Sequence, residues 1–332
     1  MSEGPDAPDS PAAPDTADAP EGAAAPDAPA APDAPNGGQG TALVLGGGGF
    51  TAMAWEIGVL KGLADAGCDL TAADLVVGTS AGAVLGARIT AGERPDDLFA
   101  QETDGTAYSP DLRIGLVLTA RYLWAALGSR SSAGSARRLG RFGRGAVRTG
   151  EEEVLAEIGR LLPAAAWPQR PLRIASVDAD SGETGYFDRA SEVELRRAVA
   201  ASGAVPGIWP PIAARGRHWI DGGVRSGANP ALAMGQARAV VLAPIPDVPG
   251  PHPGAAAETA ALARTGVRTL LLTPDAAARR AFGHNPLDPA RRPAAAEAGR
   301  AQGIARAGDV AAVLLGGAGS AGGASGASGA GV

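Results

Sequence analysis

A single serine, Ser80, lies at the centre of the pattern Gly78-Thr79-Ser80-Ala81-Gly82. An apolar run, 74–77, precedes this pattern, and a helix-prone stretch, 83–89, follows it. This is the context of a nucleophile elbow, in which small neighbouring residues let the serine adopt a strained backbone conformation between a strand and a helix. The start of that helix favours the negative charge that develops during acyl transfer. The pattern predicts a nucleophilic serine, although similar turns also serve only to pack a helix against a sheet.

Four consecutive glycines, 46–49, follow the first apolar run of the chain, and each of them costs backbone entropy on folding. One reason for such a run is that its backbone N–H groups can bind the oxyanion of a tetrahedral intermediate. Another is the binding of a pyrophosphate, since the relaxed dinucleotide motif Gly-x-Gly-x-x-Ala ends at Ala52. The acids about twenty residues further on, Asp65 and Asp69, precede the second apolar run instead of closing it. This order disfavours the dinucleotide.

A third pattern, 219–223, places Asp221 at the end of a short predicted strand and ahead of two glycines. A serine hydroxyl needs a base to become a nucleophile, and a carboxylate can serve when burial raises its pKa from about 3.9. The paired glycines would let the carboxylate approach the elbow without steric conflict. Taken alone, the pattern favours an ordinary Asp-Gly turn, so its weight comes from the two other patterns.

The histidines offer a second choice of base: His218, His252 and His284. In an α/β-hydrolase the histidine follows the acid along the chain, which leaves His252 and His284. Both lie in loops flanked by proline or glycine, where we expect solvated side chains. Only one predicted strand, 41–45, precedes the strand that leads into Ser80, whereas an α/β-hydrolase has several. The sequence therefore favours a Ser-Asp dyad over a triad.

The apolar patterning alternates between strand and helix periods, which predicts a parallel sheet with right-handed crossovers. The predicted strands are 41–45, 75–77, 172–177, 184–187, 218–220, 239–243 and 268–272. The predicted helices include 53–66, 83–91, 153–162 with a capping box that begins at Thr149, 192–201 and 289–315.

The three patterns, in this order along the chain, resemble the patatin-like phospholipases, which are lipid acyl hydrolases that use a Ser-Asp dyad. The likeness extends to 57–61, 201–206 with 210–211, and 229–230, and it covers roughly 42–243. It implies a three-layer α/β/α fold with a mainly parallel central sheet. It also implies cleavage of fatty acyl esters, of the phospholipase A or carboxylesterase type, through an acyl-enzyme.

The same resemblance assigns roles to single residues. Ser80 would be the nucleophile and Asp221 the general base. The oxyanion hole would be formed by the amides of Gly47, Gly48 and Gly49, and the elbow and loops would be shaped by Gly46, Gly78, Gly82, Gly222 and Gly223. No cofactor or metal is implied, because the base is a carboxylate and the sequence shows no cluster of metal ligands; the lone Cys68 excludes an intrachain disulfide and a Cys-based metal site.

One departure from the family pattern concerns the residues after Gly49. The family usually continues with an arginine or lysine followed by glycine, but here Phe50, Thr51 and Ala52 follow. The loop lacks that cation, and loss of an oxyanion donor typically costs ~10²-fold or more in rate. The alternative function is therefore a non-catalytic lipid-binding or regulatory protein with the same fold.

Composition bounds the folded part of the 332-residue chain to roughly 41–315. The first forty residues are rich in Ala, Pro and Asp and contain eight acids without a lysine or arginine, which predicts a disordered tail; 316–332, of Gly, Ala and Ser, predicts another. Without the eight acids, the net charge of −6 becomes +2, which gives no reason to expect a nucleic-acid partner. The N-terminus lacks a signal-peptide pattern, and we expect a cytoplasmic protein.

The segment 104–150 combines an apolar stretch, 112–124, with six arginines: Arg130, Arg137, Arg138, Arg141, Arg144 and Arg148. This combination suits a lid that contacts anionic lipid headgroups. The expected partners are therefore the lipid or phospholipid substrate and, through peripheral contact, an anionic membrane. The sequence slightly favours the alternative, a core helix followed by a solvated basic loop.

Overall fold

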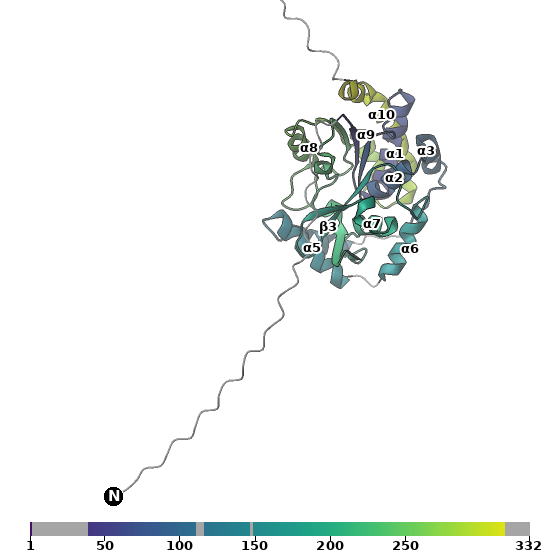
Figure 1. Ribbon diagram of the computed structural model, residues 1–332. Coiled ribbons are helices and arrows are strands. Elements are labelled where there is room, and N and C mark those ends of the chain that lie inside the picture. The colour runs from purple at the N-terminus through teal and green to yellow at the C-terminus, as the bar shows by residue number, and fades with distance from the viewer. Residues whose placement is uncertain (2–38, 111–115, 147–148, 316–332) are drawn as a thin grey trace, which may run out of the picture.

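The computed structural model describes residues 1, 39–110, 116–146 and 149–315, and their strands form one eight-stranded sheet between helical layers (Figure 1). The strands are β1 (Thr41–Leu45), β2 (Leu75–Thr79), β3 (Leu172–Asp178), β4 (Thr184–Phe187), β5 (Ile212–Ala214), β6 (Arg217–Asp221), β7 (Arg238–Leu242) and β8 (Arg268–Leu272). Their order is β5-β6-β3-β2-β1-β7-β8, and β4 pairs with β3. The strands β3, β2, β1, β7 and β8 are parallel, whereas β4, β5 and β6 join by antiparallel pairings. The predicted three-layer fold with a mainly parallel sheet is confirmed.

Ten α-helices flank this sheet in the described part of the chain. They are α1 (Gly49–Asp65), α2 (Ala81–Thr90), α3 (Pro95–Thr103), α4 (Leu116–Leu127), α5 (Ser132–Ala146), α6 (Glu151–Leu161), α7 (Leu195–Ser202), α8 (Ala255–Ala263), α9 (Ala276–Phe282) and α10 (Arg292–Leu315). Short 3₁₀ turns occupy Arg189–Ser191, Gly222–Val224, Pro230–Ala233 and Pro289–Arg291. Among the described helices, none combines the length and the apolar character needed to cross a bilayer. Both predicted tails lie almost wholly outside the described residues.

The side chains of β1 show how the sheet separates two cores. Leu43 and Leu45 point to the face covered by α1, α2, α7 and α10, whereas Ala42 and Val44 point to the face covered by α8. This alternation is the period of two that a strand imposes on its side chains. All four side chains are fully buried, so β1 is central both in the sheet and between the layers. Figure 1 shows α1 and α10 on one side of the sheet and α8 on the other.

Several predicted boundaries were wrong. Helix α1 begins at Gly49 and not near Met53, because Gly49 turns into the helix with a φ of 77° that only glycine adopts readily. The predicted capping box at Thr149 does not form: Gly150 is the N-cap of α6, without a side-chain hydrogen bond, and Thr149 lies one position too early to cap. The predicted strand 75–77 continues to Thr79, which brings the elbow directly to the end of β2.

Two further differences lie near the second half of the sheet. The predicted helix 192–201 begins only at Leu195, because Glu192 adopts a left-handed conformation with a φ of 55° after a 3₁₀ turn. The three-residue strand β5 was not predicted, since three residues are too few to show a period.

Helices α1 and α10 cross at glycines. A Cβ atom added at Gly58 of α1 would lie 2.0 Å from the Ala296 carbonyl oxygen, and one added at Gly299 of α10 would lie 2.2 Å from the Trp55 carbonyl oxygen. These are backbone atoms that cannot move independently, so the close approach of the two helices depends on the absence of side chains. This contact matters for function because α1 begins with the glycine-rich loop.

We expect Gly299→Ala to destabilise the protein by about 2–3 kcal/mol, because the new methyl group must push α10 away from α1. The matched control is Gly308→Ala in the same helix, where the added Cβ would meet no atom within 4 Å. That change should leave stability unchanged or raise it by up to about 1 kcal/mol, as alanine replaces glycine in an exposed helix. Urea denaturation of both variants checks the difference, and equal midpoints would contradict the packing argument.

Candidate active site

Strand β3 aligns the ends of two strands that are far apart in the sequence. Its residue Ala175 pairs with Thr79, the last residue of β2, and the next residue, Ser176, pairs with Asp221, the last residue of β6. Both pairings lie on the same edge of β3, because β4 occupies the other edge at these positions. Since β2 runs parallel and β6 antiparallel to β3, their carboxyl ends meet head to head. The sheet therefore places Ser80, which follows β2, beside Asp221.

The elbow at Ser80 has the strained geometry that the sequence predicted. Ser80 has a φ of 53° and a ψ of −115°, at the N-cap of α2. Its amide donates to the hydroxyl of Ser202 at 2.8 Å, which holds the turn from α7. A Cβ at Gly82 would lie 2.4 Å from the Leu45 carbonyl oxygen, and a Cβ at Gly78 would lie 2.6 Å from the Gly82 carbonyl oxygen. Small residues are thus required on both sides of the serine.

The glycine-rich loop packs directly against the elbow. A Cβ at Gly47 would lie 3.1 Å from the Ser80 Cβ and 3.8 Å from its Oγ. The Gly47 amide donates to the Gly227 carbonyl at 2.8 Å, whereas no described residue accepts a hydrogen bond from the amides of Gly48 and Gly49. These two amides precede or begin α1, where a helix leaves its first donors unpaired. Of the three predicted oxyanion donors, two are therefore available in this conformation.

The base of the loop is held by a buried carboxyl group that sequence reasoning did not single out. Glu56, in α1, is fully buried, and its Oε1 accepts a hydrogen bond from the Gly46 amide at 2.7 Å. Burial raises the pKa of Glu56 well above its usual range, which favours the neutral carboxyl. The Gly46 carbonyl in turn accepts from the Gly82 amide at 3.1 Å. Glu56 thus fixes the point at which the loop joins the elbow.

The carboxylate of Asp221 is buried, with 5% of the residue exposed. Burial raises its pKa to about 6, against smaller lowering contributions from hydrogen bonds of the Ser80 hydroxyl and the Gly223 amide. The Gly223 amide donates to Oδ1 of Asp221 at 2.6 Å, and the Ser80 hydroxyl makes the larger of the two lowering contributions to the pKa. A pKa raised to about 6 lies closer to neutrality than that of an ordinary aspartate, as a carboxylate that accepts a proton requires.

A second residue that sequence reasoning did not assign, Asn229, connects the segment that ends before Ser80 to the segment that follows Asp221. Its φ of 54° turns the side-chain amide inward, where Nδ2 donates to the Thr79 hydroxyl at 3.1 Å and to the Gly222 carbonyl at 3.4 Å. One side chain thus contacts the residue before Ser80 and the residue after Asp221. Asn229 and Ser202 both lie in stretches that matched the family pattern, so that match was the available signal.

Ser80 and Asp221 line one cavity of about 250 Å³. Gly47, Gly48 and Gly49 line the same cavity, together with Tyr122 of α4 and many apolar side chains such as Val199 and Trp209. Burial, and to a smaller extent the charge of Asp221, raises the pKa of Tyr122, so this phenol stays neutral beside the carboxylate. The side chains that line the cavity are mainly apolar, as is usual for the binding site of a small molecule.

No histidine is among the described residues that line this cavity. His218 and His284 are exposed. His252, which we expected to be solvated, is instead partly buried: its Nδ1 hydrogen-bonds to the Ser132 hydroxyl at 2.6 Å, and burial lowers its pKa. The described residues also contain no group of three or more His, Cys, Asp or Glu placed to hold a metal ion.

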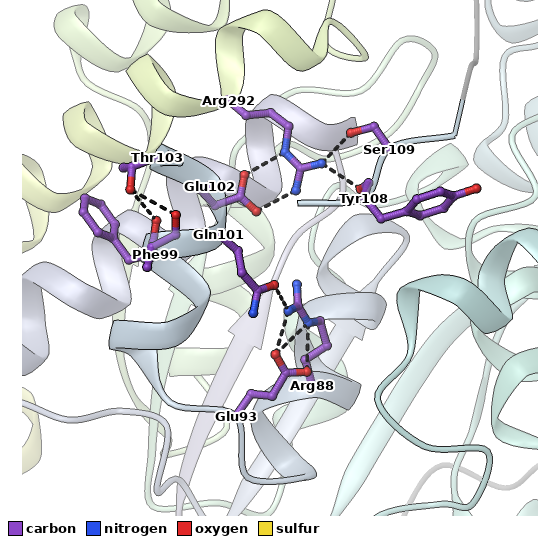
Figure 2. A network of polar contacts seen from close by, with 10 residues as sticks. Arg88, Glu93, Phe99, Gln101, Glu102, Thr103, Tyr108, Ser109 and Arg292 are labelled. Atoms are coloured by element: carbon purple, nitrogen blue, oxygen red, sulfur yellow. Dashed lines mark hydrogen bonds and ion pairs between the residues drawn. The ribbon is translucent and has the colours of Figure 1, made fainter. Parts of the chain in front are cut away.

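An arginine from the far end of the sequence approaches the loop where the family usually has a cation. The Arg292 guanidinium lies 5.5 Å from the centre of the Phe50 ring, and Phe50 also lines the cavity. Figure 2 shows Arg292 paired with Glu102 through two hydrogen bonds, at 2.6 and 2.7 Å, and donating to the Tyr108 carbonyl and the Ser109 hydroxyl. Both charges of the pair are buried. This network fixes the Phe50 ring beside the loop.

Thr51, the residue after Phe50, is held by the segment around Pro286. The amide and hydroxyl of Thr51 both donate to the Pro286 carbonyl, at 3.1 and 3.3 Å. A Cβ at Gly49 would lie 2.7 Å from the same carbonyl oxygen, so the segment around Pro286 covers the start of α1 closely.

Comparisons with known proteins identify the family to which the chain belongs. A family model described as patatin-like phospholipase matches residues 43–234. The solved structure of VipD from Legionella pneumophila is 14% identical, with a TM-score of 0.34, over 61% of this chain and 50% of that chain. The structure of the type III effector protein ExoU is 15% identical, with a TM-score of 0.37, over 82% of this chain and 53% of that chain. The chain thus spans about half the length of either protein, and no curated protein matches significantly. Because the family model covers more than half of the sequence, the chain belongs to the patatin-like phospholipase family.

Proposed function

We propose that this protein hydrolyses fatty acyl esters of lipids, as a serine acyl hydrolase with Ser80 as nucleophile and Asp221 as general base. The observation that carries the proposal is the meeting of these two side chains at one apolar cavity, beside the unpaired amides of Gly48 and Gly49. We further propose that 41–315 form the catalytic domain.

The proposed reaction begins with the transfer of the Ser80 hydroxyl proton to Asp221 while Oγ attacks the acyl carbonyl carbon. The carbonyl oxygen becomes an oxyanion, which the amides of Gly48 and Gly49 stabilise. The ester C–O bond then breaks, and Asp221 returns the proton to the leaving alcohol. Water, deprotonated by Asp221, attacks the acyl-enzyme, releases the fatty acid and restores Ser80.

The cavity lining supports a lipid substrate. Met53, Val84 and Leu161 line it from three helices, and Ile208 and Trp209 add apolar surface near the dyad. Burying an acyl chain against these side chains supplies binding energy of about 0.8 kcal/mol for each methylene removed from water. The apolar walls of the cavity therefore favour binding of the acyl chain, and the polar headgroup would remain at the open side.

A fluorophosphonate probe tests the proposal directly. We expect one mole of probe to be bound per mole of protein, with mass spectrometry locating it at Ser80, because only a serine activated by a base reacts at this centre. Ser80→Ala should bind none, and Ser181→Ala, which alters a serine in the turn after β3, should bind as much as the wild type.

A folded wild-type protein that stays unlabelled would contradict the proposed function. The alternative of a non-catalytic lipid-binding protein makes that prediction, since its serine would need no activation.

A further inference from the structure

Helix α4 exposes an apolar stripe that the rest of the described protein leaves uncovered. Trp124 is 74% exposed, Leu127 65% and Leu123 37%. These positions are spaced by three and four residues along the helix and so share one face. The opposite face carries Ala125 and Ala126, which are buried against the sheet. The stripe therefore lies outward on a helix that is itself firmly packed.

Helix α5 exposes an arginine face next to this stripe. Arg137, Arg141 and Arg144 recur at intervals of three and four residues, and all three are exposed. Leu139 and Ala136, on the other face, are buried. The helix is thus amphipathic, with cations as its outer surface.

Two stacking contacts join the helices into one surface. The Arg138 guanidinium lies 4.6 Å from the centre of the Trp124 ring, and that of Arg121 lies 5.2 Å from the centre of the Phe142 ring. Arginine and tryptophan side by side suit the interface of a membrane, where rings sit at the level of headgroups. We call Leu123, Trp124, Leu127, Arg130 and the arginines of α5 the α4–α5 surface.

Part of the positive charge on this surface is left without an acidic partner. Arg144 pairs with Asp180 at 2.6 Å, and Arg137 donates to the Ser181 carbonyl. Arg130 and Arg141 form no ion pair with any residue that the structure describes. Arg148, the last of the six arginines in the segment 104–150 that were expected to contact lipid, lies outside the described residues.

We propose that the α4–α5 surface docks the protein onto anionic lipid bilayers. Trp124, Leu123 and Leu127 enter the boundary between headgroups and acyl chains, and the arginines pair with anionic headgroups. The inference rests on the proposed function, because docking to a bilayer serves an enzyme whose substrate is a lipid. Because Tyr122, one residue before the stripe, lines the catalytic cavity, docking brings a wall of that cavity to the lipid surface.

Charge favours a lipid surface over a second copy of this chain. A symmetric dimer through this surface would bring the same face of both copies together. The unpaired arginines would then oppose one another, with Asp180 already engaged. An anionic bilayer offers a flat, negative and partly apolar partner that satisfies both halves of the surface.

The test measures binding of full-length protein to vesicles of phosphatidylcholine, with and without phosphatidylglycerol. Trp124→Gln with Leu127→Gln should weaken binding at least about tenfold, because two apolar side chains no longer enter the lipid. Arg130→Gln with Arg141→Gln should weaken binding to the anionic vesicles by at least about tenfold, and added salt should reduce the difference between the two lipid compositions.

Matched controls separate docking from general changes of polarity and charge. Ile304→Gln removes a 47% exposed apolar side chain from α10, which Figure 1 shows at the opposite end of the molecule from α5. Arg264→Gln with Arg280→Gln removes the same charge from exposed positions, directly after α8 and within α9 respectively. Both controls should bind as the wild type does.

Turnover of a soluble short-chain ester keeps this inference separate from the proposed function. The docking variants should hydrolyse the soluble ester at the wild-type rate and lose hydrolysis of vesicle lipid. Equal vesicle binding by the wild type and the docking variants would overturn the docking surface, even if soluble-ester hydrolysis is intact. A wild-type dimer that the Trp124 and Leu127 changes split, without vesicle binding, would overturn it in favour of self-association.

Discussion

Asp221→Asn should lower kcat on a soluble ester by about 10³-fold or more, because the amide cannot accept the proton of the attacking serine. Its shape preserves the hydrogen bond from the Gly223 amide, which the Asn oxygen can still accept. Ser80→Ala should cost at least as much, and the double variant should be no worse than Ser80→Ala alone, since the two side chains act as one unit. Steady-state kinetics on all three variants checks this.

The same substitution should make the protein more stable at neutral and alkaline pH. The pKa of Asp221 is 3.8 in the unfolded chain and about 6 in the fold, so folding favours the protonated carboxyl. This contribution is fully present below the unfolded pKa and is lost as pH rises through 6. At pH 8 the buried charge therefore costs the fold up to about 3 kcal/mol, which a neutral asparagine avoids.

Thermal unfolding at pH 8 should thus show a higher Tm for Asp221→Asn than for the wild type, by a few degrees. Asp180→Asn is the control, since its carboxylate lies on the surface in the turn after β3 and is far less buried. It should change neither turnover nor Tm appreciably. An Asp221→Asn variant that keeps more than a tenth of wild-type turnover would remove Asp221 from the role of base.

The elbow could be predicted from the sequence because its cause is local. A serine with a φ of 53° needs small residues at its sides, and Gly78 and Gly82 show that need directly in the sequence. The predicted strands are short apolar runs with a clear length, so the fold class followed from their alternation with helices.

The meeting of Ser80 with Asp221 could not be predicted in this way. It depends on the register of β3, in which Ala175 and Ser176 pair with strands that come from opposite directions. Neither Ala175 nor Ser176 belongs to a sequence pattern that indicates a catalytic role. The sequence patterns and the family resemblance pointed to the two residues, but the physical reason for their meeting lies in the sheet.

The departure after Gly49 shows the same limit. From the sequence, Phe50 could only be recorded as the loss of a cation. The fold brings Arg292 to that ring from a helix more than two hundred residues away, and it brings Glu102 from α3 to neutralise the arginine. Contacts of this range leave no periodic pattern in the chain, so they could not be inferred before the structure.

The rate of acylation should depend on pH through the ionisation of Asp221. Only the charged carboxylate can act as base, and its pKa is about 6. We therefore expect kcat/KM to be level above pH 7 and to fall about tenfold for each unit below 6, reaching about a hundredth of the plateau at pH 4. The second-order rate of labelling by a fluorophosphonate should follow the same curve, because it uses the same proton transfer.

A return to pH 8 after incubation at pH 4 controls for unfolding, and it should restore the full rate. Since burial lowers the pKa of His252, a histidine base would also give an acidic limb near this range, so the profile needs a second variant. His252→Gln should leave both the plateau and the midpoint unchanged, because the Ser132 hydroxyl and not Ser80 contacts this ring. If the His252→Gln variant lost the midpoint near pH 6, the histidine would be the base, in a site that rearranges to bring it to Ser80. Asp221 would then orient the histidine and would not itself accept the proton.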